Sequence, residues 1–248
     1  MSENAIPAST LIVFRDCGAR APELLTVTRA KTMVFAGGAI VFPGGRIDDA
    51  DRSHPAGGSL LDAAARIAAI RETIEESGIP AGLTPLPAPD LTRSLQDALH
   101  DGASFVDLLA QHRLGLDLQA LTPFTRWKPA FKHARVFDTH FYLTRAPDGD
   151  WTPRFQPGEC EAVEWMSAAE ALERIERGTA SAIFPTKRNL ERLARFASFD
   201  EAVADAARHP VELITPWIER RGGEDHVCIP EGLGYPVTSE PLASSFRA

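Results

Sequence analysis

The 248-residue chain has few cysteines and no excess of positive charge. Its three cysteines, Cys17, Cys160 and Cys228, are far apart, odd in number and form no Cys-x-x-Cys pair. This argues against a disulfide framework or a zinc site and fits a reducing compartment. The net charge is -8 without a long basic run, so we expect no nucleic-acid polymer as a partner. The negative net charge does not exclude small phosphate-bearing ligands, because metal ions and a few basic side chains can hold them.

Long apolar segments are also missing. No apolar run approaches transmembrane length, and residues 1–10 have neither the basic region nor the apolar region of a signal peptide. We therefore expect a cytoplasmic protein without a membrane partner. There is no internal repeat and no low-complexity segment. With 44% hydrophobic and 24% charged residues, the composition is ordinary for one large globular domain, with or without an appendage.

The order of the expected elements predicts a mixed sheet with helices on both sides, hence an α/β or α+β fold without a regular βαβ period. Strands are expected at 9–14, 24–28, 39–42, 121–127, 135–143 and 162–165, the first two as a hairpin. Helices are expected at 59–77, in two short pieces within 91–115, at 167–177 and at 187–207. Ser59 and Gly78 would bound the first helix, while 43–45 would be a turn and 48–58 a loop.

The helix expected over 59–77 carries three carboxylates on one face. Glu72, Glu75 and Glu76 stand at i, i+3 and i+4, where their charges repel each other. A hard divalent cation that takes oxygen ligands would remove this repulsion. Taken alone, such a run is usually a solvated helix face. The glycine turn before it and Gly78 after it favour a binding site instead.

The stretch from Gly45 to Ile79 resembles the signature of Nudix hydrolases, Gly-x5-Glu-x7-Arg-Glu-U-x-Glu-Glu-x-Gly-U, where U is a bulky aliphatic residue. The second half matches at Arg71-Glu72, Glu75-Glu76 and Gly78-Ile79, with Thr73 at an aliphatic position. In the first half, Asp51 stands where the signature has Glu. The signature spacing would place the arginine at position 59, and it stands at 71, so 12 residues are inserted. The role of Asp51 therefore stays open.

The resemblance implies an α/β/α sandwich with a mixed sheet, a helical insert at about 88–118 after the signature, and extra C-terminal helices. It covers about residues 8–205, which we expect to form a Nudix hydrolase domain. Residues 206–248 are then expected to be a C-terminal extension packed on that domain. Homodimers are common in the family, but no patch in this sequence identifies an interface.

The same resemblance implies hydrolysis of a nucleoside diphosphate linked to another moiety, with Mg²⁺ or Mn²⁺ as cofactor. A diphosphate anion repels hydroxide, so metal ions must neutralise it and orient a water. The implied metal ligands and nearby backbone are Glu72, Glu75, Glu76, Gly44 and Gly45. Arg71 either orients a carboxylate, such as Glu75 at i+4, or contacts phosphate, and we favour the orienting role.

A further carboxylate is expected from a loop beyond the signature, as metal ligand or general base. Glu159 lies six residues before Trp165, a spacing similar to that of mutator-type members, and Glu161 in the same loop is the competitor. For each of them, an exposed edge charge is the alternative. Cys160 between them is interpreted as incidental.

The substrate branch is suggested by the segment before the glycines. Leu24 to Ala30, followed by Gly38-x3-Phe42-Pro43-Gly44-Gly45, is similar to the coenzyme A signature of larger Nudix proteins related to the peroxisomal enzymes. It departs by one extra residue between Thr26 and Arg29 and by Val34 in place of a second arginine.

We therefore expect coenzyme A or an acyl-CoA as the small-molecule diphosphate substrate. ADP-ribose or NADH hydrolysis is the alternative, and a non-catalytic Nudix-fold binding or regulatory protein is the alternative of another class. Arg29 and Arg135 are candidate substrate-binding residues. Lys31, Lys132 and His133 are interpreted as surface cations, and Trp127 as a core residue.

Overall fold

The computed structural model describes residues 5–30, 37–58, 60, 62–129, 136–155 and 160–245, without the side chains of residues 57, 244 and 245. Within these ranges the largest sheet has eight strands in the order β10-β7-β8-β1-β2-β3, with β4 paired to β1 and β9 paired to β2. Two pairs are parallel, β1 with β8 and β7 with β10, so the sheet is mixed. The strands are β1 (Ile6–Cys17), β2 (Arg20–Arg29), β3 (Ile40–Val41), β4 (Gly44–Arg46), β7 (Thr122–Trp127), β8 (Phe137–Arg145), β9 (Cys160–Ser167) and β10 (Leu213–Ile214).

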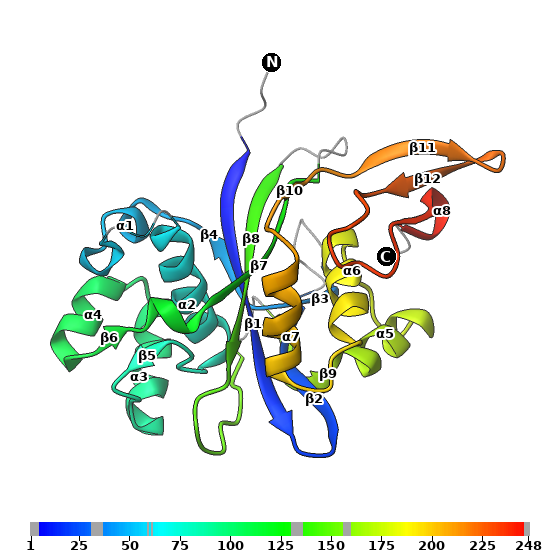
Figure 1. Cartoon of the computed structure of the whole chain (residues 1–248). Helices are drawn as coiled ribbons and strands as arrows, with labels where there is room; N and C mark the ends of the chain where they lie inside the picture. The colour runs from blue at the N-terminus through cyan, green and yellow to red at the C-terminus, as the bar shows by residue number, and fades with distance from the viewer. Residues whose placement is uncertain are drawn as a thin grey trace.

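Helices cover both faces of this sheet (Figure 1). Alternate residues of β1 enter different cores: Leu11 and Val13 pack with α2, α3 and α4, whereas Ile12 and Phe14 pack with α5, α6 and α7. The predicted sandwich is thereby confirmed. The helices are α1 (Asp49–Arg52), α2 (Ala63–Ser77), α3 (Pro89–His100), α4 (Phe105–His112), α5 (Ala168–Glu176), α6 (Phe184–Leu193), α7 (Phe199–Arg208) and α8 (Leu242–Ser245), with 3-10 turns η1 (Pro55–Gly57) and η2 (Leu118–Ala120).

The acidic helix forms as expected, apart from its start. Ile67, Ile70 and Ile74 are fully buried and fix its orientation on the sheet. It ends at Gly78, which has a φ of 67° and donates its N–H to the Ile74 carbonyl. Its N-cap is Asp62, while the predicted cap, residue 59, lies outside the described residues.

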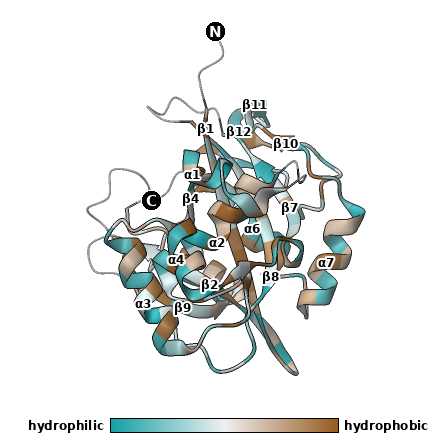
Figure 2. Ribbon diagram, turned by 90° about the vertical axis from the view of Figure 1, so that its left-hand side faces the viewer, coloured by the Kyte–Doolittle hydropathy of each residue, from teal (hydrophilic) through white to brown (hydrophobic). Residues whose placement is uncertain are grey.

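The helical insert is confirmed as α3 and α4. The chain breaks between them at Gly102, whose φ of 84° suits glycine. Both helices are amphipathic, as is α7, where hydrophobic and hydrophilic residues alternate along the ribbon (Figure 2). The apolar stripe of α3 and α4 packs beside α2, so the insert lies next to the acidic helix.

The predicted turn at 43–45 is wrong, because Gly44–Arg46 forms β4. This strand pairs antiparallel with Ala8–Thr10 of β1. A Cβ at Gly44 would lie 2.4 Å from the Ser9 carbonyl oxygen, so the close approach of two backbones needs glycine here. Strand propensity does not predict this strand, since glycine is a poor strand former.

The predicted loop at 48–58 and the single helix at 187–207 are also wrong. The first segment contains α1 and η1, because the Asp51 carboxylate accepts a hydrogen bond from the Asp48 N–H and closes a helical turn. The second splits into α6 and α7, because the Ser198 hydroxyl caps a new helix by accepting the Glu201 N–H.

Residues after 205 contact the sheet and α6. Trp127, a fully buried core residue as expected, donates its indole N–H to Tyr235, and Tyr235 donates to Asn189. A small sheet in this part consists of β11 (Trp217–Arg221), β12 (Glu224–Cys228) and β13 (Ser239–Pro241), and a second small sheet joins β5 (Leu83–Thr84) to β6 (Gly115–Leu116). None of the helices in the described part of the chain has the length and apolar character needed to cross a membrane.

Candidate active site

The acidic face of α2 lies against the glycine strand β4. The Gly44 N–H donates a hydrogen bond of 2.9 Å to Glu76 Oε2. A Cβ at Gly45 would lie 2.4 Å from Glu72 Oε1, so only glycine lets this carboxylate reach the backbone. The two halves of the split signature, separated by 12 inserted residues, therefore meet in one place.

Arg71 is the centre of a charge network. Its Nε and Nη2 donate to both carboxylate oxygens of Asp51, at 3.0 and 2.8 Å, and its Nη1 donates to Glu72 Oε1 at 2.8 Å. Glu75, the partner considered from sequence, lies at 3.5 Å. Burial lowers the pKa of Arg71, but the hydrogen bond to Asp51 and the charge of Glu72 outweigh it, so its pKa is raised.

Asp51 is the partner that sequence spacing did not identify. Its side chain is 2% exposed, and it is held by α1 opposite Arg71, 20 residues along the chain. A two-oxygen, two-nitrogen pair of this kind fixes the plane of the guanidinium. The substitution of Asp for Glu in the signature thus still leaves a carboxylate that locks Arg71 in place.

Glu72 is the most perturbed carboxylate of the site. Burial raises its pKa, Arg71 opposes that effect, and the charge of Glu75 adds to it, with a result of about 7. A buried carboxyl with a pKa near neutrality loses its proton readily once a cation approaches. The local electrostatics therefore favour uptake of positive charge beside Glu72.

The donor chemistry fits a hard divalent cation. The carboxylates of Glu72, Glu75 and Glu76 and the carbonyl of Gly44 are oxygen donors, which Mg²⁺ and Mn²⁺ prefer. Within the described ranges, no three His, Cys, Asp or Glu side chains are grouped as a metal centre. The three carboxylates are instead engaged by the protein: Glu76 accepts the Gly44 N–H, Glu72 accepts a hydrogen bond from Arg71, and Glu75 lies 3.5 Å from Arg71.

Of the other predicted site residues, Arg29 and Glu161 lie on the large sheet, and the rest lie outside the described residues. Arg29 ends β2, and its Nε is buried without a hydrogen-bond partner among the described residues. Glu161 is exposed in β9 at a bulge, where Thr28 pairs with Ala162 and Arg29 with Cys160. Glu159, Arg135, Lys31, Lys132 and His133 lie outside the described residues.

A pocket of about 330 Å³ opens over Arg71 and Glu75. One wall comes from residues 48–54 and the other from residues 99–106, between α3 and α4. His54 and Phe105 face each other there, with ring centroids 6.2 Å apart. Neither residue was expected at the site from the sequence, because no local pattern indicates that these two segments meet.

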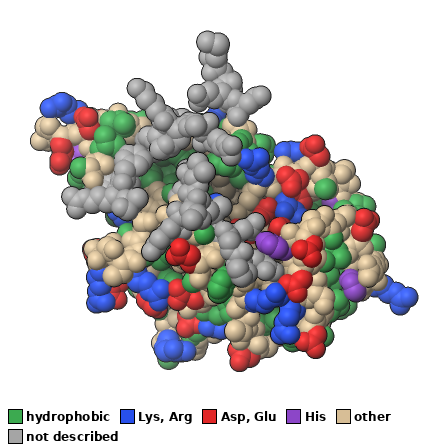
Figure 3. All heavy atoms as spheres, turned by 180° about the vertical axis from the view of Figure 1, so that it is seen from behind, with side chains coloured by type: hydrophobic (Ala, Val, Ile, Leu, Met, Phe, Trp, Pro, Cys, Tyr) green, Lys and Arg blue, Asp and Glu red, His purple; other side chains and the backbone are tan. Residues whose placement is uncertain are grey.

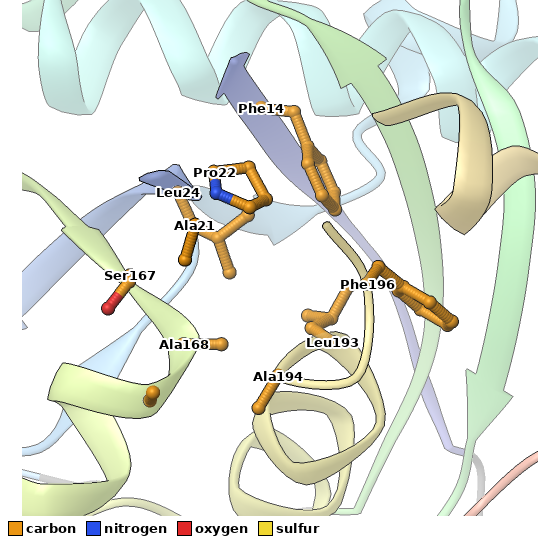
Figure 4. A pocket seen from close by; sticks show the side chains of 10 residues that line it. Phe14, Ala21, Pro22, Leu24, Ser167, Ala168, Leu193, Ala194 and Phe196 are labelled. Atoms are coloured by element: carbon orange, nitrogen blue, oxygen red, sulfur yellow. The ribbon is translucent and has the colours of Figure 1, made fainter. Parts of the chain in front are cut away.

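A second pocket is too small and too apolar to be a candidate binding site. It measures only about 20 Å³ and is lined mainly by apolar side chains, among them Phe14, Leu24 and Phe196 (Figure 4). A buried water needs two or more polar partners, which such a wall does not supply. On the face shown in Figure 3, described acidic and basic side chains are interspersed.

Comparisons with known proteins agree with this geometry. The family model of the NUDIX domain matches residues 6–185. Acyl-coenzyme A diphosphatase NUDT19 of Gallus gallus is 28% identical over 283 residues, which cover 85% of this chain and 73% of that protein. The crystal structure of a NUDIX hydrolase from Alicyclobacillus acidocaldarius is similar with a TM-score of 0.70 and 30% identity, covering 82% of this chain and 97% of that one. The chain belongs to the Nudix hydrolase family.

Proposed function

We propose that this hydrolase cleaves the diphosphate bond of coenzyme A or an acyl-CoA with the help of Mg²⁺ or Mn²⁺. Water adds across the P–O–P linkage, and the products are adenosine 3′,5′-bisphosphate and a 4′-phosphopantetheine. The observation that carries the chemistry is the acidic face of α2 held against the glycines of β4. The similarity to an acyl-coenzyme A diphosphatase supports the substrate.

The carboxylates of Glu72, Glu75 and Glu76 and the Gly44 carbonyl, together with Glu159, would hold the cation. When bound, it would neutralise the diphosphate and lower the pKa of water. Arg71 keeps Glu72 oriented through its 2.8 Å hydrogen bond.

The remaining roles belong to the substrate side of the site. Glu159 or Glu161 would accept the proton of the attacking water. Arg29 and Arg135 would bind substrate phosphate. The buried Nε of Arg29, which has no hydrogen-bond partner in the described part of the chain, supports that role. The backbone of Gly44 and Gly45 would lie close to the diphosphate, since neither residue has a Cβ in the way.

A substrate panel tests the proposal. Purified protein with Mg²⁺ or Mn²⁺ is incubated with coenzyme A, octanoyl-CoA, ADP-ribose and NADH, and the products are identified by mass spectrometry. We expect both coenzyme A compounds to be cleaved best. If they stay intact while ADP-ribose or NADH is cleaved, the substrate assignment is wrong and the dinucleotide alternative holds. Failure to cleave any of them would favour a non-catalytic binding role.

Three further properties are part of the proposal. The Nudix domain would span residues 8–205, with 206–248 as an extension, which the contacts of Tyr235 with Trp127 support. A cytoplasmic location is supported by the three cysteines, all of them in the described part of the chain, because none of them forms a disulfide bond. A homodimer, common in the family, would give twice the chain mass in light scattering.

A further inference from the structure

The pocket over Arg71 and Glu75 is built by segments that the compact signature does not need. One wall is the α1–η1 region, where the 12 extra residues of the split signature begin, and the other is the turn between the insert helices α3 and α4. Its volume of about 330 Å³ is within the range of small-molecule sites. Because Glu75 forms part of its floor, anything bound there lies beside the proposed reaction centre.

The charges of the pocket do not suit a phosphate. Asp48, Asp51 and Glu75 line it together with the single cation Arg71. Arg71 is already committed, with both Asp51 oxygens within 3.0 Å and Asp48 at 3.7 Å. Even with Glu75 assigned to the proposed cation, Asp48 and Asp51 outnumber Arg71. A phosphate group would therefore meet more negative than positive charge, and an uncharged ligand would not meet this repulsion.

The wall opposite these charges is mainly apolar. Leu99 and Phe105 are buried, Val106 is half-buried and Ala103 is exposed, and Gly102 and Ser104 complete this wall. The Ser104 hydroxyl caps α4 by accepting the Asp107 N–H at 3.3 Å. Such a surface gains free energy when it covers apolar groups of a ligand. A sugar in this position would place hydroxyl groups against carbon and lose their hydrogen bonds to water.

On the side of residues 48–54, His54 also lines the pocket and carries a ring nitrogen without a partner among the described residues. His54 Nδ1 accepts the Ala56 N–H at 3.0 Å, which leaves the proton of the neutral ring on Nε2. Nε2 is buried and has no partner among the described residues. Burial lowers the pKa of His54, against the opposing effect of Asp51, and so favours this neutral form. A ligand with one oxygen acceptor beside apolar groups would satisfy it.

These features distinguish the two sides of coenzyme A. One side of its diphosphate carries adenosine with a charged 3′-phosphate, and the other carries an uncharged arm with a gem-dimethyl group and amide oxygens. We infer that the pocket binds this pantetheine arm, with its methyl groups against Phe105 and Val106 and an oxygen toward His54. The inference rests on the proposed function and assigns one side of the substrate to the two inserted segments.

The test compares the two cleavage products as ligands. Ala103→Trp fills the pocket from an exposed position, and Val106→Asp replaces an apolar contact by a charge that suits the first turn of α4. Ala110→Trp, on an exposed position of α4 outside the pocket, is the matched control. Binding of 4′-phosphopantetheine and of adenosine 3′,5′-bisphosphate is measured by calorimetry with Mg²⁺, and folding by circular dichroism.

We expect both pocket variants to weaken 4′-phosphopantetheine binding about tenfold while the bisphosphate affinity changes less than about twofold. The Ala110→Trp protein should bind both products as the wild type does. Equal losses for the two products, or unchanged 4′-phosphopantetheine binding in both folded pocket variants, would overturn the inference. Failure of the wild type to cleave coenzyme A would instead overturn the proposed function, so the two failures are distinct.

Discussion

Replacement of Asp51 by asparagine should destabilise the protein even when no metal ion is bound. Asp51 is nearly fully buried, and both of its oxygens accept hydrogen bonds from Arg71, whose side chain is 12% exposed. The substitution keeps the shape of the side chain and removes its charge. The guanidinium then stays buried beside a neutral amide, with Glu72 as its nearest charged partner.

The size of the effect follows from this burial. Loss of one partner of a buried ion pair costs about 3–5 kcal/mol. Because the asparagine side chain would keep one oxygen acceptor and Glu72 stays in place, we expect about 3 kcal/mol, or a fall in Tm of roughly 6–12 °C for a chain of this size. Asp51→Asn and Arg71→Gln should also be coupled, with a double-mutant interaction energy of about 2 kcal/mol.

Urea unfolding in EDTA, followed by tryptophan fluorescence, measures the loss in free energy of unfolding and, from the double-mutant cycle, the interaction energy. Asp49→Asn is the matched control, because Asp49 lies on the same helix, is fully exposed and is 3.8 Å from Arg52. Its effect should stay within about 0.5 kcal/mol. If Asp51→Asn costs no more than this control, or costs stability only when Mg²⁺ is added, then Asp51 does not serve to hold Arg71 and is better explained as a metal ligand.

Three further outcomes are expected. Gly45→Ala would push the Glu72 carboxylate away and lower kcat on the order of tenfold or more, which steady-state kinetics would show. Gly44→Ala would instead clash with the β1 backbone and mainly lower the free energy of unfolding, which urea unfolding would show. Burial raises the pKa of Glu191 to about 7 and outweighs the opposing effect of Arg188. The protonated carboxyl therefore contributes to stability, and this contribution is lost as pH rises from about 4.5 to 7. Over this pH range the free energy of unfolding of Glu191→Gln should fall by about 1–2 kcal/mol less than that of the wild type, and parallel pH profiles of the two proteins in urea unfolding would refute this. Saturating Mg²⁺ at about 100 times its Kd should stabilise the wild type by about 2.7 kcal/mol in thermal unfolding, and a similar gain in Glu72→Gln would contradict the assignment of Glu72.

Local patterns were sufficient for much of the fold. The hairpin of β1 and β2 and the burial of Ile67, Ile70 and Ile74 follow from periodicity over a few residues. Gly78 and Gly102 end helices in left-handed conformations that favour glycine. The acidic face of α2 was predictable for the same reason, since i, i+3 and i+4 spacing fixes which side chains share a face.

Contacts between distant segments were not predictable. The pairing of Arg71 with Asp51 depends on a helical turn, α1, that a proline- and glycine-containing segment does not suggest. β4 exists because β1 approaches its glycines closely, which no propensity of glycine indicates. The meeting of His54 with Phe105 depends on how the insert packs beside α2. In each case the cause is tertiary packing across an insertion.

The central claim is that the acidic face of α2 performs the hydrolysis with a bound divalent cation. Turnover of coenzyme A at saturating Mg²⁺ should fall on the order of a hundredfold in Glu75→Gln and Glu76→Gln, with circular dichroism spectra unchanged. Glu176→Gln, an exposed carboxylate at the end of α5, should keep wild-type turnover. Turnover in Glu75→Gln and Glu76→Gln within about twofold of this control would contradict the claim.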